Sequence, residues 1–295
     1  MTSHLSWNLV YDYRELLSFH FMLNAMRAGT IVAVVSGVAG YFMVLRRQAF
    51  AGHTLSVVGF PGAAGAFWLG ANAAFGFYGF CVLAALIFAT LPGAGRSAGR
   101  VGNQEPAVIG TVQGLALASG FLFLNLSHGF AGELNDLLFG VIIGVTDGQV
   151  IALLVSGVVC LLVLAAVARP LLFTSVDADV AAARGLHPRL LSAIYLVVLG
   201  VSVAATSQIT GSLLVFALLV APAATAVRLT ARPALGVLLS VLIALAVTWL
   251  GEGIAFFSPY PIGFWVTTFA FLAFLLATGY HWAAARVRVP AAVTA

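Results

Sequence analysis

Long apolar runs separated by short polar connections extend through almost the whole chain. A helix needs roughly 17 to 25 apolar residues to cross a bilayer, so each run is close to the length of one membrane span. Because the connections are short, we expect no water-soluble domain between the runs. The pattern therefore predicts an all-α, polytopic membrane helix bundle of eight or nine transmembrane helices. The runs are residues 28–45, 54–69, 73–91, 107–126, 148–167, 190–206, 211–227, 234–250 and 263–280.

The second run decides between eight and nine helices. Its neighbourhood, residues 52–70, contains Gly59, Pro61, Gly62 and Gly65. Proline lacks the backbone N–H that continues a helix, and glycine adopts conformations that other residues avoid. We therefore expect this segment to bend or unwind locally at Pro61, which membranes tolerate where the backbone faces protein or a water-filled cavity.

The arginines predict the orientation of the bundle. When the runs cross the bilayer alternately, most arginines fall on one face, and the positive-inside rule makes that face cytoplasmic. We expect residues 1–27 to form an extracytoplasmic N-terminal segment, 28–285 a single transmembrane domain, and 286–295 a cytoplasmic tail. The cytoplasmic arginines are Arg46, Arg47, Arg96, Arg100, Arg169, Arg184, Arg189, Arg228, Arg232, Arg286 and Arg288, whereas Arg14 and Arg27 lie near the other face.

A polar segment, SVDADVAAARGLHP at residues 175–188, separates two strongly apolar runs on the cytoplasmic face. Asp177 is suited to cap the start of a short helix, and Gly185 is suited to end it. Pro188 then prevents the helix from continuing. We expect this cytoplasmic helix, which includes Asp179, to be the part of the chain to which another molecule binds.

The composition excludes several classes of protein. Hydrophobic residues make up 62% of the chain and charged residues only 7%, which excludes a water-soluble globule. Lysine is absent, so the phosphate-binding signature that ends in GK[ST] cannot occur, and we expect no such ATPase site in this chain. The net charge of +4 comes from arginines beside the spans, so no nucleic-acid partner is expected. Cys81 and Cys160 lie inside apolar runs and are expected to be buried.

Four segments together resemble a known family. They are LRRQAFAGHTLSVVGFPGAAGA at 45–66, LFGVIIGVT at 138–146, SVDADVAAARGL at 175–186 and TGSLLVFALLVAPAATAVRL at 210–229. The last is similar to the signature GxLLxxALLxxPAATA, and the third is similar to a cytoplasmic segment in which an acidic start and a terminal glycine flank a short helix. In these motifs and their order, the chain resembles the permease subunit of the ABC-type importers for zinc, manganese or iron, the ABC-3 family.

The resemblance implies an assembly in a bacterial inner membrane. Two copies of the permease would associate with two cytosolic ATP-binding subunits and an extracytoplasmic solute-binding protein. The permease would move a divalent transition-metal ion inward by alternating access, and it would bind no cofactor of its own. Asp177, Asp179 and Gly185 would belong to the contact that couples ATP hydrolysis to transport. Pro222, inside an apolar run, would bend the pathway near its cytoplasmic end.

His53 is the first candidate metal ligand, since imidazole ligates zinc and also suits manganese or iron. The family carries an aspartate at this position and a histidine four residues later, so that two donors face one side of a helix. Here the two positions hold His53 and Val57. In place of one oxygen and one nitrogen ligand, these two positions offer one nitrogen ligand and the apolar side chain of valine. The alternative is a hydrogen-bonded structural histidine near the cytoplasmic interface.

Glu252 is the second candidate, because it lies at the outer end of a span, where a carboxylate is placed to receive a cation. The alternative is a solvated residue in an outward loop at 251–262. Other functions also stay open. Val57 favours import of another small ligand by the same machinery. A self-contained secondary transporter or channel normally needs ionisable groups deep in its spans, where this sequence has almost none, and a membrane enzyme would need clustered catalytic groups that we do not find.

Overall fold

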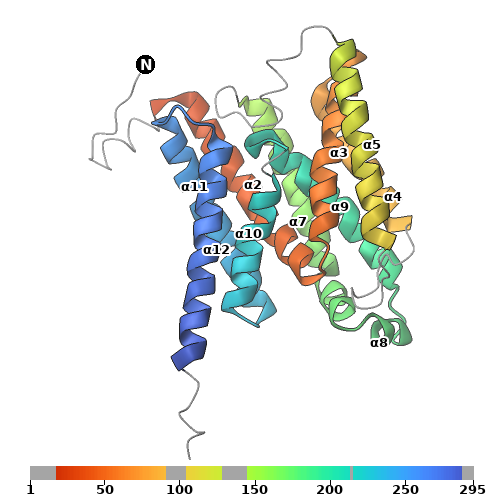
Figure 1. Ribbon diagram of the computed structural model, residues 1–295, viewed down its shortest axis with the longest axis vertical. Helices are drawn as coiled ribbons and strands as arrows, with labels where there is room; N and C mark the ends of the chain where they lie inside the picture. The colour runs from red at the N-terminus through yellow and green to blue at the C-terminus, as the bar shows by residue number, and fades with distance from the viewer. Residues whose placement is uncertain (1–17, 91–103, 128–144, 213–214, 288–295) are drawn as a thin grey trace, which may run out of the picture.

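The computed structural model describes residues 18–90, 104–127, 145–212 and 215–287, and this part of the chain is helical with no strand (Figure 1). The expected all-α fold is confirmed, and each of the apolar runs forms a helix. The helices are α2 (His20–Leu45), α3 (Ala49–Trp68), α4 (Ala73–Thr90), α5 (Gln104–Leu126), α7 (Asp147–Val176), α8 (Ala178–Ala183), α9 (Pro188–Thr210), α10 (Val215–Leu229), α11 (Pro233–Phe256) and α12 (Ile262–Val287).

Seven of the described helices are long and apolar enough to cross a membrane by length and composition. Helix α10 is shorter, with 15 residues, and α3 carries His53 and Pro61 within its sequence. Neither is among the seven, although both pack inside the bundle. Length and composition alone therefore identify fewer spans than the eight or nine that the apolar runs predict.

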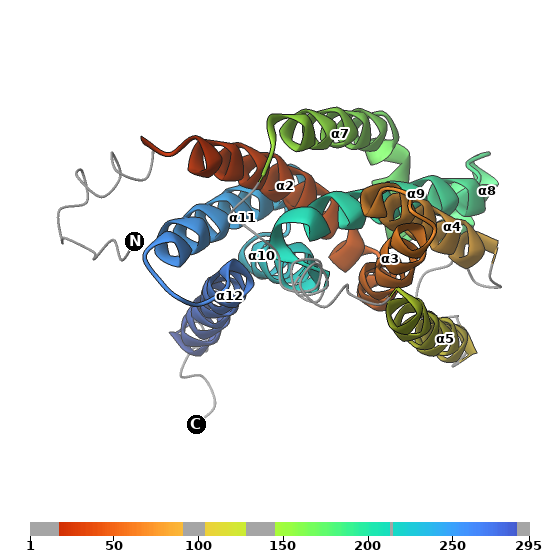
Figure 2. The same ribbon diagram turned by 90° about the horizontal axis from the view of Figure 1, so that it is seen from above.

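Helix α2 lies in the middle of the bundle, in contact with α7, α9, α10 and α11, while α3 packs between α4 and α5 (Figure 2). Small residues allow the close approach of α2 and α11. A methyl group at Gly37 would lie 2.7 Å from the Cα of Val241. Beside it, the hydroxyl of Ser240 donates a 2.7 Å hydrogen bond to the carbonyl of Gly37. Glycine therefore serves here for packing between helices rather than for a turn.

Two helices are longer than their apolar runs. Helix α7 continues through Arg169 and Pro170 to Val176, and α11 continues to Phe256. The prediction of an outward loop over 251–262 is therefore wrong for its first half. The last turn of α11 stays helical because it packs on its neighbours: Gly251 lies against Val266 of α12, and Glu252 lies against α2. The segment LFGVIIGVT falls mostly outside the described residues.

Candidate functional site

His53 lies in the second turn of α3, where this helix meets α5 and α10. Its Nε2 atom is 3.4 Å from the amide nitrogen of Gln113 in α5. The edge of its ring meets Phe216 of α10, with ring centroids 5.1 Å apart. An amide N–H that donates to Nε2 places the imidazole proton on Nδ1. This Nδ1 atom is buried and has no hydrogen-bond partner among the described residues.

Gln113 completes a small polar cluster around His53. Its side-chain oxygen accepts a hydrogen bond of 3.2 Å from the hydroxyl of Thr54. Val57, one turn after His53, is buried and adds only an apolar surface. The groups in this cluster that could ligate an ion are therefore one imidazole, one amide and one hydroxyl. Sequence reasoning missed Gln113, because the residue is 60 positions from His53 and no motif connects them.

Glu252 is fully buried in α11, so the alternative of a solvated loop residue is wrong. Its carboxylate rests on Gly29 of α2, where an added methyl group would overlap the carboxylate. Both of its oxygens lack a hydrogen-bond partner among the described residues, as does the hydroxyl of Thr248 one turn earlier. An ionised carboxylate is very costly in such surroundings, so this group must hold either a proton or a cation when the helices are packed this way.

The structure does not bring the two candidate ligands together. His53 contacts α5 and α10, whereas Glu252 lies against α2. Within the described ranges, no three His, Cys, Asp or Glu side chains are grouped so that they could hold a metal ion. A cation at His53 would therefore bind through one strong protein ligand and neutral oxygen or nitrogen atoms. Such a ligand set favours weak binding during transport over tight, long-lived binding.

The expected cytoplasmic helix is present as α8, and its ends are built as the sequence predicts. Asp177 Oδ1 accepts hydrogen bonds of 3.0 Å from the backbone N–H groups of Asp179 and Val180. Gly185 ends the helix with φ of +83°, a conformation that favours glycine. Pro188 does more than stop this helix, because it also begins α9.

Helix α8 presents a mixed surface at one end of the bundle (Figure 1). Ala178 and Ala181 face the protein, while Asp177 and Asp179 are exposed. Val180 is also exposed, as is Val176 just before the helix. Helix α8 and its start thus expose two carboxylates beside two aliphatic side chains.

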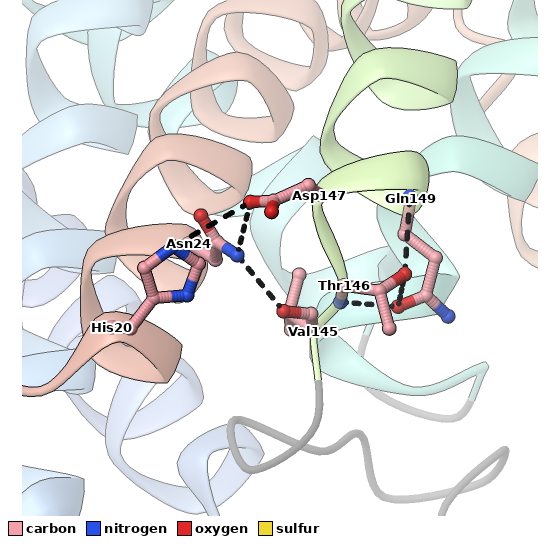
Figure 3. A network of polar contacts seen from close by, with 6 residues as sticks. All are labelled: His20, Asn24, Val145, Thr146, Asp147 and Gln149. Atoms are coloured by element: carbon pink, nitrogen blue, oxygen red, sulfur yellow. Dashed lines mark hydrogen bonds and ion pairs between the residues drawn. The ribbon is translucent and has the colours of Figure 1, made fainter.

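A separate polar network joins the first turn of α2 to the start of α7 (Figure 3). The amide of Asn24 donates to Asp147 Oδ1 at 2.8 Å and to the carbonyl of Val145 at 3.3 Å. His20 Nε2 lies 3.9 Å from the same carboxylate oxygen. Thr146 and Gln149 form a capping box at the start of α7. Asp147, the first residue of α7, thus ties the start of this helix to α2.

Comparison with known proteins gives a consistent result. Residues 18–281 match the sequence profile of a family described as the ABC 3 transport family. The manganese transport system membrane protein MntC of Halalkalibacterium halodurans is 30% identical over 76% of this chain and 75% of its own length. The chelated iron transport system membrane protein YfeC of Yersinia pestis is 28% identical, covering 88% of this chain and 85% of its own.

A solved structure has the same fold. The structure titled PsaBC from Streptococcus pneumoniae in complex with Fab superimposes with a TM-score of 0.80 and 27% sequence identity. The match covers 91% of this chain and 95% of that chain. The arrangement of the described helices therefore resembles that of most of a chain in that structure.

Proposed function

Because this chain belongs to the ABC 3 transport family, we propose that it is the transmembrane permease subunit of an ATP-driven importer for a divalent transition-metal ion. The family match across residues 18–281 carries this proposal. Relatives named for manganese transport and for chelated iron transport favour manganese or iron as the ion. Zinc is the third ion that the sequence motifs allow.

We propose that the energy for transport comes from another subunit. The chain has no lysine and therefore no GK[ST] phosphate-binding loop. We propose that a cytosolic ATP-binding subunit docks on α8, with Asp177, Asp179 and Gly185 in the contact. An extracytoplasmic solute-binding protein delivers the ion, and a second copy of the chain completes the pathway. The arginine distribution supports a bacterial inner-membrane protein with its N-terminus outside and its C-terminus in the cytoplasm.

Alternating access gives the candidate residues separate roles. Glu252, buried near the outer end of α11, receives the cation as the outer helices separate, because its unpartnered carboxylate then gains a counter-charge. His53 and Gln113 bind the ion in transit, where α3, α5 and α10 meet. Pro61 in α3 and Pro222 in α10 lie inside these helices and provide points at which they bend.

One observation favours a different cargo on the same machinery. Among the described residues, His53 does not belong to any group of three or more His, Cys, Asp or Glu side chains that could hold a metal ion. A small neutral or chelated ligand needs hydrogen-bond donors and acceptors, which Gln113 and Thr54 provide, more than it needs charged metal ligands.

Reconstitution separates these possibilities. The chain is placed in proteoliposomes with its ATP-binding subunit and solute-binding protein, and uptake of Mn²⁺, Fe²⁺ and Zn²⁺ is measured with and without ATP. We expect ATP-dependent uptake of at least one free ion. Uptake only of a chelated ion would favour the alternative that the transported ligand is a small neutral or chelated one. Uptake by the chain alone, driven by a proton gradient, would contradict the proposal and identify a self-contained transporter.

A further inference from the structure

Arg46 is partly covered by neighbouring helices although the residue beside it is exposed. It follows the last turn of α2 on the cytoplasmic side and is half-buried, whereas Arg47 is exposed. The positive-inside rule requires only that arginine lie on this side, and it is satisfied by a side chain in water. The half-buried position of Arg46 therefore needs a separate physical reason.

One end of the Arg46 guanidinium contacts the last turn of α7, which leads directly into α8. Its Nη1 atom donates to the hydroxyls of Ser175 and Thr174 at 3.3 and 3.4 Å. Both residues lie within three positions of Asp177, the N-cap of α8. A movement of α8 must displace the hydroxyls that Arg46 contacts.

The other side of Arg46 faces the start of α3. Its Nε atom donates to Gln48 Oε1 at 3.3 Å, and Gln48 precedes the first residue of α3. The amide of Gln48 in turn donates to Ser192 of α9 at 3.4 Å. The guanidinium carbon also lies 5.5 Å from the ring centroid of Tyr195, a fully buried side chain of α9. One side chain thus connects the ends of α2 and α7 with the starts of α3 and α9.

The connection between α2 and α3 is too short to absorb a displacement. Arg47 has φ of +56°, the one positive value among the described non-glycine residues. The N–H of Gln48 bonds back to the carbonyl of Met43 at 3.0 Å. Such a tight turn moves as a unit, so a shift of Gln48 is transmitted to the first turns of α3, where His53 lies.

We propose that Arg46 is a positioning residue that transmits movement of α8 to the start of α3. It thereby couples ATP hydrolysis at the cytosolic subunit to the position of His53. This inference rests on the proposed function and adds to it a route from the docking helix to the ion pathway. The Arg46 junction comprises Arg46, Gln48, Thr174, Ser175, Ser192 and Tyr195.

The test compares the number of ions transported per ATP hydrolysed. The complete complex is reconstituted in proteoliposomes, and Mn²⁺ uptake and ATP hydrolysis are measured in the same preparation. For Arg46→Gln we expect the ratio to fall by roughly tenfold or more, because the charge-assisted hydrogen bonds of the guanidinium are lost, with ATP hydrolysis retained. Arg46→Lys retains the charge and should restore part of the ratio. Arg47→Gln, the matched loss of charge in the same turn, should leave the ratio unchanged.

A mutant cycle shows whether Arg46 acts through the Arg46 junction or through a surface contact with the ATP-binding subunit. The double variant Thr174→Ala, Ser175→Ala removes the acceptors in α7 without changing any charge. It should lower the ratio as Arg46→Gln does, and combining all three changes should lower it no further. Independent, additive effects would overturn the proposal. Equal losses in Arg46→Gln and Arg47→Gln would also overturn it, because they would indicate a shared contact with the ATP-binding subunit.

Two results distinguish this inference from the proposed function itself. If the unaltered complex hydrolyses ATP without transporting Mn²⁺, Fe²⁺ or Zn²⁺, the proposed function fails. If the unaltered complex transports Mn²⁺ and Arg46→Gln transports it with the same ratio, only the role of Arg46 is refuted. Should Arg46→Gln fail to assemble, the hydroxyl double variant provides the same comparison with a smaller change in side-chain volume.

Discussion

At the scale of single residues, His53 and Glu252 stand out because each has a buried polar atom without a hydrogen-bond partner among the described residues. His53 has a neutral partner in Gln113 and an apolar neighbour in Phe216. Glu252 has both oxygens buried and fits only because residue 29 has no side chain. Buried polar groups without full partners are costly, so their presence in a membrane bundle points to function rather than to stability.

His53→Ala should lower the initial rate of Mn²⁺ uptake by about tenfold or more, since it removes the one strong ligand of the cluster. Gln113→Ala should lower the rate less, because the amide is a weaker donor to a cation. Uptake kinetics in proteoliposomes measure both effects, with assembly checked by co-purification of the ATP-binding subunit. Unchanged kinetics in His53→Ala would refute its role as a ligand.

Gly29→Ala should destabilise the bundle by about 1–3 kcal/mol, because the added methyl group overlaps the Glu252 carboxylate and forces the helices apart. Shortening the acid in Glu252→Ala should remove most of that cost in the double variant. Thermal unfolding in detergent reports the difference. Gly253→Ala is the matched control on α11, since a methyl group there meets no atom within 4 Å.

At the scale of elements, α8 is a short helix whose two ends are determined by local chemistry. Asp177 satisfies the N–H groups at its start, and Gly185 adopts the left-handed conformation that its end requires. Six residues form too few hydrogen bonds to hold a helix alone, so these caps and the buried alanines position it. A protein that binds α8 would therefore contact a helix whose position and ends are fixed.

Gly185→Leu should uncouple ATP hydrolysis from transport. A leucine at φ of +83° costs about 1–2 kcal/mol, which shifts or frays the end of α8 against its partner. The measured quantity is again Mn²⁺ transported per ATP. Gly70→Leu imposes similar strain at φ of +73° in the connection between α3 and α4, far from α8 in the chain, and should preserve the ratio. Normal coupling in Gly185→Leu would argue against docking at α8.

At the scale of the whole molecule, the orientation of the bundle decides which partner meets which end. The connection of α2 to α3 and helix α8 share one end, and the first residues of α2 and α7 meet at the other (Figures 1 and 3). The Arg46 contacts join the two elements at the first end. If arginines mark the cytoplasm, both elements face the ATP-binding subunit.

Cysteine labelling tests this orientation, and the chain suits the experiment because Cys81 and Cys160 are both buried. Ala182→Cys on the exposed side of α8 should react with a membrane-impermeant maleimide only after the cytoplasmic face is opened. Asn72→Cys, exposed between α3 and α4, should react in intact cells. Labelling of residue 182 from outside would invert the topology and remove the basis for ATPase docking there.

Features that depend on neighbours along the chain follow from the amino-acid sequence alone. The apolar runs became helices because length and hydrophobicity act locally, and α8 formed between Asp177 and Gly185 because caps satisfy backbone groups a few residues away. Which side chains meet depends instead on how the helices pack in three dimensions. Glu252 is buried because the last turn of α11 packs on α2, Gln113 reaches His53 from another helix, and Arg46 contacts residues 128 and 129 positions away. Such contacts depend on the packing of whole helices, which no local pattern of residues specifies.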